Sequence, residues 1–376
     1  MKWLRLAPIL VIIASAGASP LYTLADLGTL GGSSAMATAV NSFGQAVGAM
    51  ATPSGYMDAY SFSGSGATNL NFAGPANGIN DAGQIAGTAQ IGPQSYATVW
   101  NNGVASTVGG AGSYGMAINN SGNVAGMLIN NGEGNAFVTQ NGTVIELGSF
   151  SGGSWSAAYG INDQGQAAGY GMTSSGSFQA FIWTPGQGYS APLTLGGANS
   201  YAMAINNSGM AAGTSQITNG FAHAFVSNGS SIKDLGTLGG NSSYAYGINN
   251  LGNVVGYSWT SSNRMDGFLD EGGVMYDMNA LLIDAPGWTV TQLYGINDSN
   301  QVVGIGVLNG IQHAVLLTDP PPPGAESTSS VNASSVTTSS ADTPEPAAWM
   351  ITFGGLTALV LIRFASRPPL HPRNQR

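Results

Sequence analysis

Apolar residues along most of the chain occur in short runs bounded by glycine, asparagine and serine, as in Ala180 to Trp183 and Gln301 to Gly304. Short runs that are rich in β-branched and aromatic residues and lie between turn-forming residues are typical of β-strands. The pattern therefore predicts an all-β protein that is built from many short strands.

One group of strands recurs seven times with a period of about 43 residues, and each copy is centred on an asparagine preceded by Val or Ile. These asparagines are Asn41, Asn80, Asn119, Asn162, Asn206, Asn249 and Asn297. A glycine follows three residues later in six copies, and Asn300 takes its place in the seventh. Because asparagine is the residue that best replaces glycine at positive φ, this segment predicts a tight hairpin turn between two strands.

Each copy also predicts a third and a fourth strand, which gives the size of one β-propeller blade. The segment Tyr22 to Leu27 reads as a fourth strand with no copy before it, while the last copy ends after its third strand, His313 to Leu317. We therefore predict a seven-bladed β-propeller over residues 19–317, closed by the N-terminal strand so that no sheet edge stays open at the joint. The residue two before each asparagine is always Ala or Gly, which is expected where first strands crowd around an axis.

Both ends of the chain predict export. Lys2 and Arg5 precede an apolar run and small residues up to Ala18, which is typical of a secretory signal peptide (residues 1–18) removed by signal peptidase. Near the other end, an uncharged run over residues 347–362 precedes several arginines, as in a transmembrane helix whose C-terminus stays cytoplasmic. Such a helix spans about 24 Å against about 30 Å of hydrocarbon, so we expect the inner membrane to hold it only transiently.

Residues 318–343 join the repeats to this apolar run. They contain a proline run and then mainly Ser, Thr and Ala, which cannot bury enough apolar surface to fold. We predict that they form a disordered spacer.

The C-terminal end carries a recognisable arrangement of residues. Pro344, Glu345 and Pro346 stand before the apolar run, and Arg363 and Arg367 follow it. Residues 344–376 thereby resemble the PEP-CTERM sorting signal of exopolysaccharide-producing Gram-negative bacteria. The resemblance implies processing by an exosortase and a destination outside the cell or on its outer surface.

The repeat resembles the extracellular HAF-repeat family. The resemblance rests on Leu-Gly-Thr-Leu-Gly-Gly at 27–32 and 235–240, on the recurring Gly-Ile-Asn-x-x-Gly-Gln and on His223-Ala224-Phe225. It spans residues 22–317 and implies an extracellular location without a particular activity.

Composition narrows the possible functions. The chain has no cysteine, which excludes disulfides, a thiol nucleophile and a zinc–thiolate site. All seventeen acidic residues lie between Asp26 and Glu345, where Lys233 and Arg264 are the only lysine or arginine residues. This acidic region should repel phosphate backbones, so we predict no nucleic-acid partner and expect neutral glycans or matrix proteins instead.

A polar residue precedes the apolar part of each third strand and is a candidate ligand contact. The seven residues are Asp58, Tyr96, Asn135, Gln179, His223, Asp266 and His313. Of these, Asp58, His223, Asp266 and His313 are the preferred candidates. They could contact a ligand or an ion beside the crossovers between copies, or each could cap its own β-turn or bond the crossover backbone.

Aromatic residues precede Ile-Asn in the last five copies and form a second candidate set: Tyr114, Trp155, Tyr201, Tyr244 and Trp288. We expect them to lie on the entry to a central channel, where exposed rings would stack on sugars, and we take the first four as the stacking residues of a lectin-like propeller. The alternative is that these rings pack between blades.

Catalysis has few candidate residues. Asp81, Asp163 and Asp298 each follow the asparagine of a different copy, so we expect larger separations than the acid and nucleophile of a glycoside hydrolase require. Neither a phosphate loop nor a metal-binding histidine pair occurs, and we predict no cofactor and no metal. The sequence favours a non-catalytic structural or binding module of the exopolysaccharide matrix, with a lectin-like propeller and a propeller-type glycoside hydrolase as alternatives.

Overall fold

The computed structural model describes residues 21–29, 31–52, 57–63 and 66–319, and these residues form an all-β chain with one short helix. The predicted all-β class is therefore confirmed. The predicted signal peptide, the sorting segment with its apolar run, and all but the first two residues of the predicted spacer lie outside the described residues. Within the described part, no helix is long and apolar enough to cross a membrane.

We number the repeat units 1 to 7 by their asparagines, from Asn41 to Asn297, and each unit contributes four strands. The first strands are β2 (Ala35–Val40), β6 (Ala76–Ile79), β10 (Ser113–Ile118), β14 (Gly152–Ile161), β18 (Gly196–Ile205), β22 (Gly239–Ile248) and β26 (Trp288–Ile296). The second strands are β3 (Ala46–Ala51), β7 (Ile85–Ile91), β11 (Val124–Asn130), β15 (Ala167–Thr173), β19 (Ala211–Ile217), β23 (Val254–Thr260) and β27 (Val302–Leu308).

The other two strands of each unit lie farther from the first. The third strands are β4 (Met57–Ser63), β8 (Gln94–Asn101), β12 (Glu133–Gln140), β16 (Phe178–Thr184), β20 (Ala222–Ser227), β24 (Met265–Glu271) and β28 (Ile311–Thr318). The fourth strands are β5 (Gly66–Ala73), β9 (Val104–Thr107), β13 (Thr143–Glu146), β17 (Gly188–Tyr189), β21 (Ile232–Gly236), β25 (Val274–Asp277) and β1 (Thr23–Gly28). The helix α1 (Met278–Leu281) follows β25.

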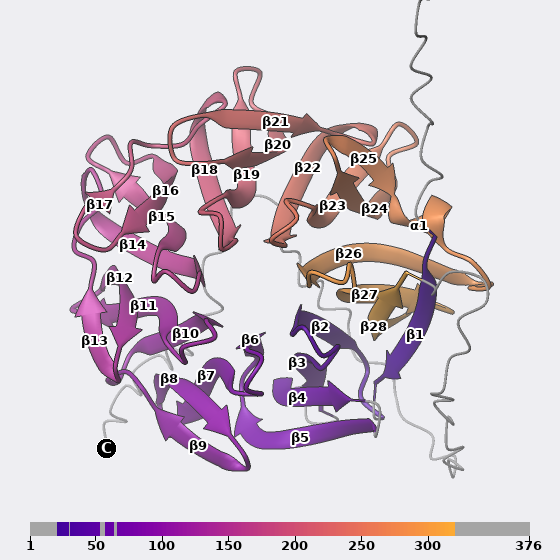
Figure 1. The fold of residues 1–376 in the computed structure, drawn as a ribbon, viewed down its shortest axis with the longest axis horizontal. Coiled ribbons are helices and arrows are strands. Elements are labelled where there is room, and N and C mark those ends of the chain that lie inside the picture. The colour runs from indigo at the N-terminus through magenta and orange to yellow at the C-terminus, as the bar shows by residue number, and fades with distance from the viewer. Residues whose placement is uncertain (1–20, 30, 53–56, 64–65, 320–376) are drawn as a thin grey trace, which may run out of the picture. The chain divides into compact units, whose positions relative to one another are not determined.

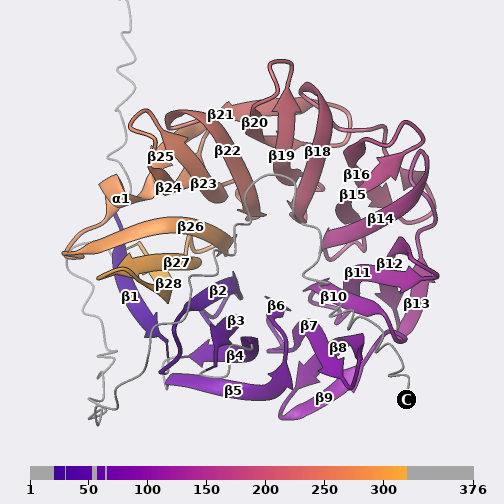
Figure 2. The same cartoon turned by 180° about the vertical axis from the view of Figure 1, so that it is seen from behind.

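The four strands of a unit pair in order, and each pair is antiparallel. The described sheets have four strands, except that units 3 and 4 share one sheet through a single parallel bridge between Gly134 and Trp155. Figure 1 shows the sheets arranged around an axis, with the first strands nearest to it. The view from behind in Figure 2 shows the same order.

The N-terminal strand belongs to the sheet of the last unit. β1 pairs with β28, from Thr23 opposite Thr318 to Gly28 opposite Ala314. Tyr22, which precedes β1, is fully buried against α1, and its backbone bonds to Leu281 and Ile283 at 2.9 Å. The first described strand of the chain is thus held between β28 and the segment that contains α1.

The turn after each first strand has the conformation that the sequence predicts. Gly44 and Gly252 have φ values of 74° and 87°, and Asn300 has a φ of 55°. The Asn300 N–H donates to the Asn297 carbonyl oxygen at 3.1 Å, as the Gly44 N–H does to Asn41. Asparagine therefore replaces glycine at a left-handed position of unit 7.

The small residues two before each asparagine lie where first strands of neighbouring units meet. A Cβ atom added to Gly160 would lie 3.0 Å from the Ala204 Cα atom, and one added to Gly295 would lie 3.1 Å from the Ala39 Cα atom. Both distances are shorter than ordinary van der Waals contact. The crowding predicted at this position is confirmed.

Each first strand also has a β-bulge three residues before its asparagine, which the sequence analysis did not predict. The bulged residues are Thr38, Asn77, Met116, Tyr159, Met203, Tyr246 and Tyr294. A bulge turns its side chain out of the regular alternation of the strand. Thr38 Oγ1 donates to the Ala76 carbonyl at 2.7 Å, and Asn77 Nδ2 to that of Gly115 at 2.7 Å, so these two bulges link neighbouring units.

Buried apolar residues form clusters between neighbouring sheets. One cluster combines Val138 of unit 3 with Ile161 and Phe181 of unit 4, and another combines Ala37 of unit 1 with Ala314 of unit 7. Each sheet is therefore held by the sheets on both sides of it, because its two faces contribute to different clusters.

Asp270 is a buried charge with an incomplete set of hydrogen bonds, and it provides a prediction about pH. It is 4% exposed, and its Oδ2 atom has no hydrogen-bond partner in the described residues. Burial raises its pKa, against the opposing effects of Lys233 and of the Gly273 backbone N–H. Since the folded state then binds this proton more tightly than the unfolded state, Asp270 lowers stability as pH rises from the ordinary carboxyl range through the raised pKa.

We therefore expect Asp270→Asn to increase the free energy of unfolding at pH 7, by about 1 kcal/mol, and to have less effect at pH 3.5. Urea unfolding at the two pH values measures this difference, with Glu146→Gln at an exposed position as the control. A variant with the same advantage at both pH values would contradict the role of the Asp270 charge.

Candidate functional site

The repeat asparagines form a closed ring of hydrogen bonds at one end of the sheets. Each side-chain amide donates to the backbone carbonyl of the asparagine in the next unit at 2.9–3.1 Å, and Asn297 donates to Asn41. All seven side chains are buried. The sequence pattern predicts a turn role for these residues, and the structure shows that they also join every unit to the next.

A second, exposed rim surrounds this ring on the same side, which we call the asparagine face. It consists of the residues after the asparagines: Ser42, Asp81, Asn120, Asp163, Asn207, Asn250 and Asp298. The N–H groups of the first six each donate to the Oδ1 atom of the next member at 2.8–3.0 Å. The serine side chain has no Oδ1 atom, and no hydrogen bond from Asp298 to Ser42 is found among the described residues.

A cavity of about 160 Å³, which we call the axial cavity, is lined by ring asparagines, rim residues and first-strand isoleucines of units 2 to 6. Two rim carboxylates are closer to each other than the sequence analysis predicts. The Oδ2 atoms of Asp81 and Asp163 both lie 3.3 Å from Asn120 Nδ2, so they are separated by no more than twice that distance. The prediction of large separations is wrong for this pair, because the small ring brings alternate units together.

Both carboxylates are engaged as hydrogen-bond acceptors. The Oδ1 atoms of Asp81 and Asp163 accept backbone N–H groups of Ser42 and Asn120, and their Oδ2 atoms accept side-chain amides. The pair is thus already occupied by hydrogen bonds within the rim.

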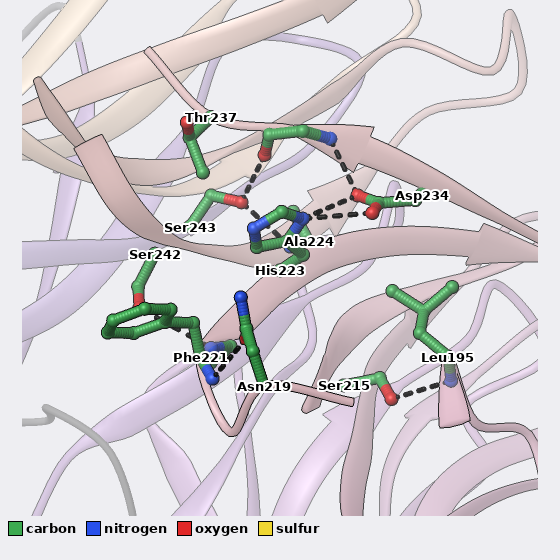
Figure 3. A network of polar contacts seen from close by, with 12 residues as sticks. Leu195, Ser215, Asn219, Phe221, His223, Ala224, Asp234, Thr237, Ser242 and Ser243 are labelled. Carbon is green, nitrogen blue, oxygen red and sulfur yellow. Dashed lines mark hydrogen bonds and ion pairs between the residues drawn. The ribbon is translucent and has the colours of Figure 1, made fainter. Parts of the chain in front are cut away.

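The candidate histidines lie at the opposite end of the sheets, where the chain passes from one unit to the next, which we call the crossover face. Figure 3 shows His223 beside Asp234 of β21, with Nδ1 lying 2.9 Å from the nearer carboxylate oxygen. His313 has the same arrangement with Asp26 of β1, at 3.0 Å. Asp234 and Asp26 also accept the N–H groups of Gly236 and Gly28 at 2.7 Å.

The two candidate aspartates are likewise paired inside their own sheets. Asp266 is 0% exposed and accepts Arg264 Nε on both oxygens at 2.8 Å. Asp58 accepts the Asn69 side-chain amide at 3.3 Å. These candidates therefore connect the third strand with the fourth or with their own hairpin. Such bonds are closer to the alternative in which each side chain stabilises a turn or crossover than to the alternative in which it contacts a ligand.

The candidate aromatic residues are half-buried. The rings of Trp155 and Tyr201 contact Tyr170 at centroid distances of 5.4 and 4.7 Å, and Tyr244 stacks on Tyr257 at 4.8 Å. Burial raises the pKa values of Tyr201 and Tyr244. None of the residues lining the axial cavity belongs to this set.

The other two aromatic residues of the set have different surroundings. Tyr114 pairs with Met127 of β11 and is half-buried. The Trp288 ring meets the His313 ring edge to face, with centroids 5.2 Å apart. Ring packing thus accounts for most of the set.

Sequence reasoning missed four serines that join neighbouring units near the crossover face: Ser113, Ser156, Ser200 and Ser243. Each is fully buried, and its hydroxyl accepts the N–H of an alanine in the third strand of the preceding unit at 2.8–2.9 Å. Figure 3 shows this contact between Ser243 and Ala224. The signal was present in the sequence, since each serine stands six residues before an asparagine.

The similarity of this chain to known proteins is limited to the fold. No family model matches the sequence, and a search of curated proteins found no match. Among solved structures, the β-propeller domain of the Trilobed protease from Pyrococcus furiosus is similar with a TM-score of 0.53 and 10% identity, covering 78% of this chain and 99% of that one.

Two further solved structures are longer than the part they share with this chain. The Pyrococcus horikoshii acylaminoacyl peptidase has a TM-score of 0.51 and 11% identity over 78% of this chain and 52% of its own. TolB from Acinetobacter baumannii has a TM-score of 0.45 and 12% identity over 73% of this chain and 64% of its own. The chain therefore spans less than two thirds of either protein. The likeness to the β-propeller domain of the Trilobed protease, at a TM-score above 0.5, shows that the fold is that of a β-propeller.

Proposed function

We propose that this chain is an exported, non-catalytic protein of the exopolysaccharide matrix, in which a closed seven-bladed β-propeller serves as a rigid binding or structural module. The observation that carries the proposal is the ring of asparagine hydrogen bonds, which runs through all seven units and returns from Asn297 to Asn41. A ring that is bonded at every joint keeps its exposed loops in fixed relative positions, as a binding platform requires.

Seven closed blades are supported by the pairing within the units. Each asparagine unit has four strands, and β1 supplies the fourth strand of unit 7. The single bridge between Gly134 and Trp155 joins two such units and leaves their internal pairing intact.

We base the proposed absence of catalysis on the hydrogen bonds of the candidate acids and histidines. A glycoside hydrolase needs one carboxylic acid that holds a proton and a second carboxylate that is ionised. Asp81 and Asp163 are near enough to each other, but each already accepts a backbone N–H group and a side-chain amide of the rim, so we assign both to the hydrogen bonds that join the units. His223 and His313 are paired with aspartates on fourth strands.

Export, removal of the signal peptide and exosortase processing are part of the same proposal, and they rest on residues 1–18 and 344–376 of the sequence. The two alternatives are a lectin-like propeller that uses Tyr114, Trp155, Tyr201 and Tyr244, and a glycoside hydrolase. The contacts of Trp155, Tyr201 and Tyr244 with other rings favour packing over stacking on sugars for these three residues.

A binding and turnover assay on the mature secreted chain tests the proposal. We expect it to bind neutral polysaccharide from the matrix, to bind acidic polysaccharide poorly, and to release no reducing sugar from either. Release of reducing sugar that is lost in Asp81→Asn and Asp163→Asn variants would instead establish the hydrolase. Absence of binding to any glycan or matrix protein would exclude a binding module.

A further inference from the structure

The two faces of the ring differ in how uniform their residues are. On the asparagine face the ring asparagine recurs in every unit, because each of these side chains bonds to the next unit. On the crossover face, the position two before the polar residue of the third strand changes from unit to unit: Gln94, Glu133, Ser177, Phe221, Arg264 and Ile311 in units 2 to 7. A position that varies while the fold around it repeats is free to serve an individual site.

A groove of about 370 Å³ lies on the crossover face where units 3 and 4 meet. It is lined by Glu133 at the start of β12, by Gly152, Gly153 and Ser154 at the start of β14, and by Met172, Thr173, Ser174 and Gly176 at the hairpin after β15. This volume lies within the range of small-ligand sites.

The sheets of units 3 and 4 approach each other closely beside the groove. The parallel bridge between Gly134 and Trp155 joins the two sheets there. A Cβ atom on Gly134 would lie 2.4 Å from Trp155 Nε1, and one on Gly153 would lie 1.7 Å from the Met172 carbonyl oxygen. Glycine is therefore required at both positions, and the indole, which packs on Tyr170 and Phe178, supports the wall of the groove.

The polar groups of the groove are mainly hydrogen-bond acceptors and hydroxyls. Glu133 and Ser154 are exposed, and no hydrogen bond to either side chain is found in the described residues. The Thr173 hydroxyl is already bonded to Ser175 and to the Ser177 carbonyl. No lysine or arginine lines the groove, and an anionic ligand would meet the Glu133 carboxylate without a compensating cation.

We propose that this groove binds one or two sugar units of a neutral polysaccharide, with Glu133 accepting hydrogen bonds from vicinal hydroxyls and Ser154 completing the contact. A neutral sugar offers several O–H donors to these acceptors, whereas a basic peptide would find a single carboxylate. The inference rests on the proposed binding function and gives it a site and a ligand class. It also assigns Trp155 a supporting role in place of the stacking role predicted from the sequence.

The test fills the groove without touching the ring. Ser154→Trp places a large side chain in the groove, and Asn241→Trp is the matched control, since Asn241 is also exposed, stands equally far before its asparagine in unit 6 and does not line the groove. Binding of cellohexaose and laminarihexaose to the full mature chain is measured by calorimetry, with an oligoglucuronate and hexalysine as charged probes. Thermal unfolding of each variant shows that it is folded.

We expect at least one neutral hexasaccharide to bind the wild type, Ser154→Trp to weaken that binding by at least about tenfold, and Asn241→Trp to leave it within about twofold. Glu133→Gln should weaken it by about tenfold, which corresponds to the loss of a charge-assisted hydrogen bond. Unchanged binding in a folded Ser154→Trp variant would overturn the groove while leaving the binding function intact. Binding of hexalysine in place of the sugars would overturn the ligand class, and a wild type that binds no neutral saccharide would overturn the groove and the glycan-binding function together.

Discussion

Replacing Asn162 by alanine should lower the free energy of unfolding by about 3 kcal/mol. The Asn162 side chain donates to the Asn206 carbonyl and to Gln166 Oε1, and its Oδ1 atom accepts the Gln166 N–H. Removing it leaves buried polar groups in two units without partners, which costs more than the bonds contribute on their own. Urea unfolding followed by far-ultraviolet circular dichroism measures the difference.

A second variant tests the bond between units separately from the bonds within the turn. Asn162→Asp keeps the oxygen that accepts the Gln166 N–H but cannot donate to Asn206 when it is ionised. It should therefore be destabilised at neutral pH because a buried carboxylate would face a carbonyl oxygen. Gln164→Ala, at an exposed position of the same turn, should change stability by less than about 0.5 kcal/mol. If Asn162→Asp were as stable as the wild type, the bond between units would contribute nothing to the ring.

Removal of residues 22–28 should destabilise the protein more than any single substitution considered above. These residues provide the whole pairing of β1 with β28 and the buried Tyr22 side chain. Tyr22→Ala alone should cost about 3–5 kcal/mol, the range for deleting a large buried aromatic side chain. Hydrogen exchange should show the loss of protection first in β27 and β28, because their sheet loses its outer strand.

Two controls make this experiment specific. Tyr22→Phe should be at least as stable as the wild type, since the Tyr22 hydroxyl is buried without a hydrogen-bond partner in the described residues. Deletion of residues 324–343 from the predicted spacer should leave the unfolding free energy unchanged. Equal stability of this deletion and of the deletion of residues 22–28 would show that β1 does not close the ring.

The candidate site could be predicted only in part. The polar positions of the third strands and the aromatic positions of the first strands are visible as recurring residue types, but their partners are not. Asp234 lies on a neighbouring strand of the same sheet as His223, and a hairpin pattern can suggest such a pair. Asp26 and His313 belong to opposite ends of the repeat region, and only the pairing of β1 with β28 brings them together.

The sequence by itself determined the repeat, the left-handed turns and the surplus strand at the N-terminus, because these features depend on local preferences of glycine and asparagine and on the order of short apolar runs. Only the tertiary structure decided which units touch through Asn162 and Asn206, how near Asp81 and Asp163 come, and where a groove opens beside Glu133. Those distances depend on how closely the sheets pack around the axis. They are set by contacts between residues about one repeat apart or more, and no local pattern encodes them.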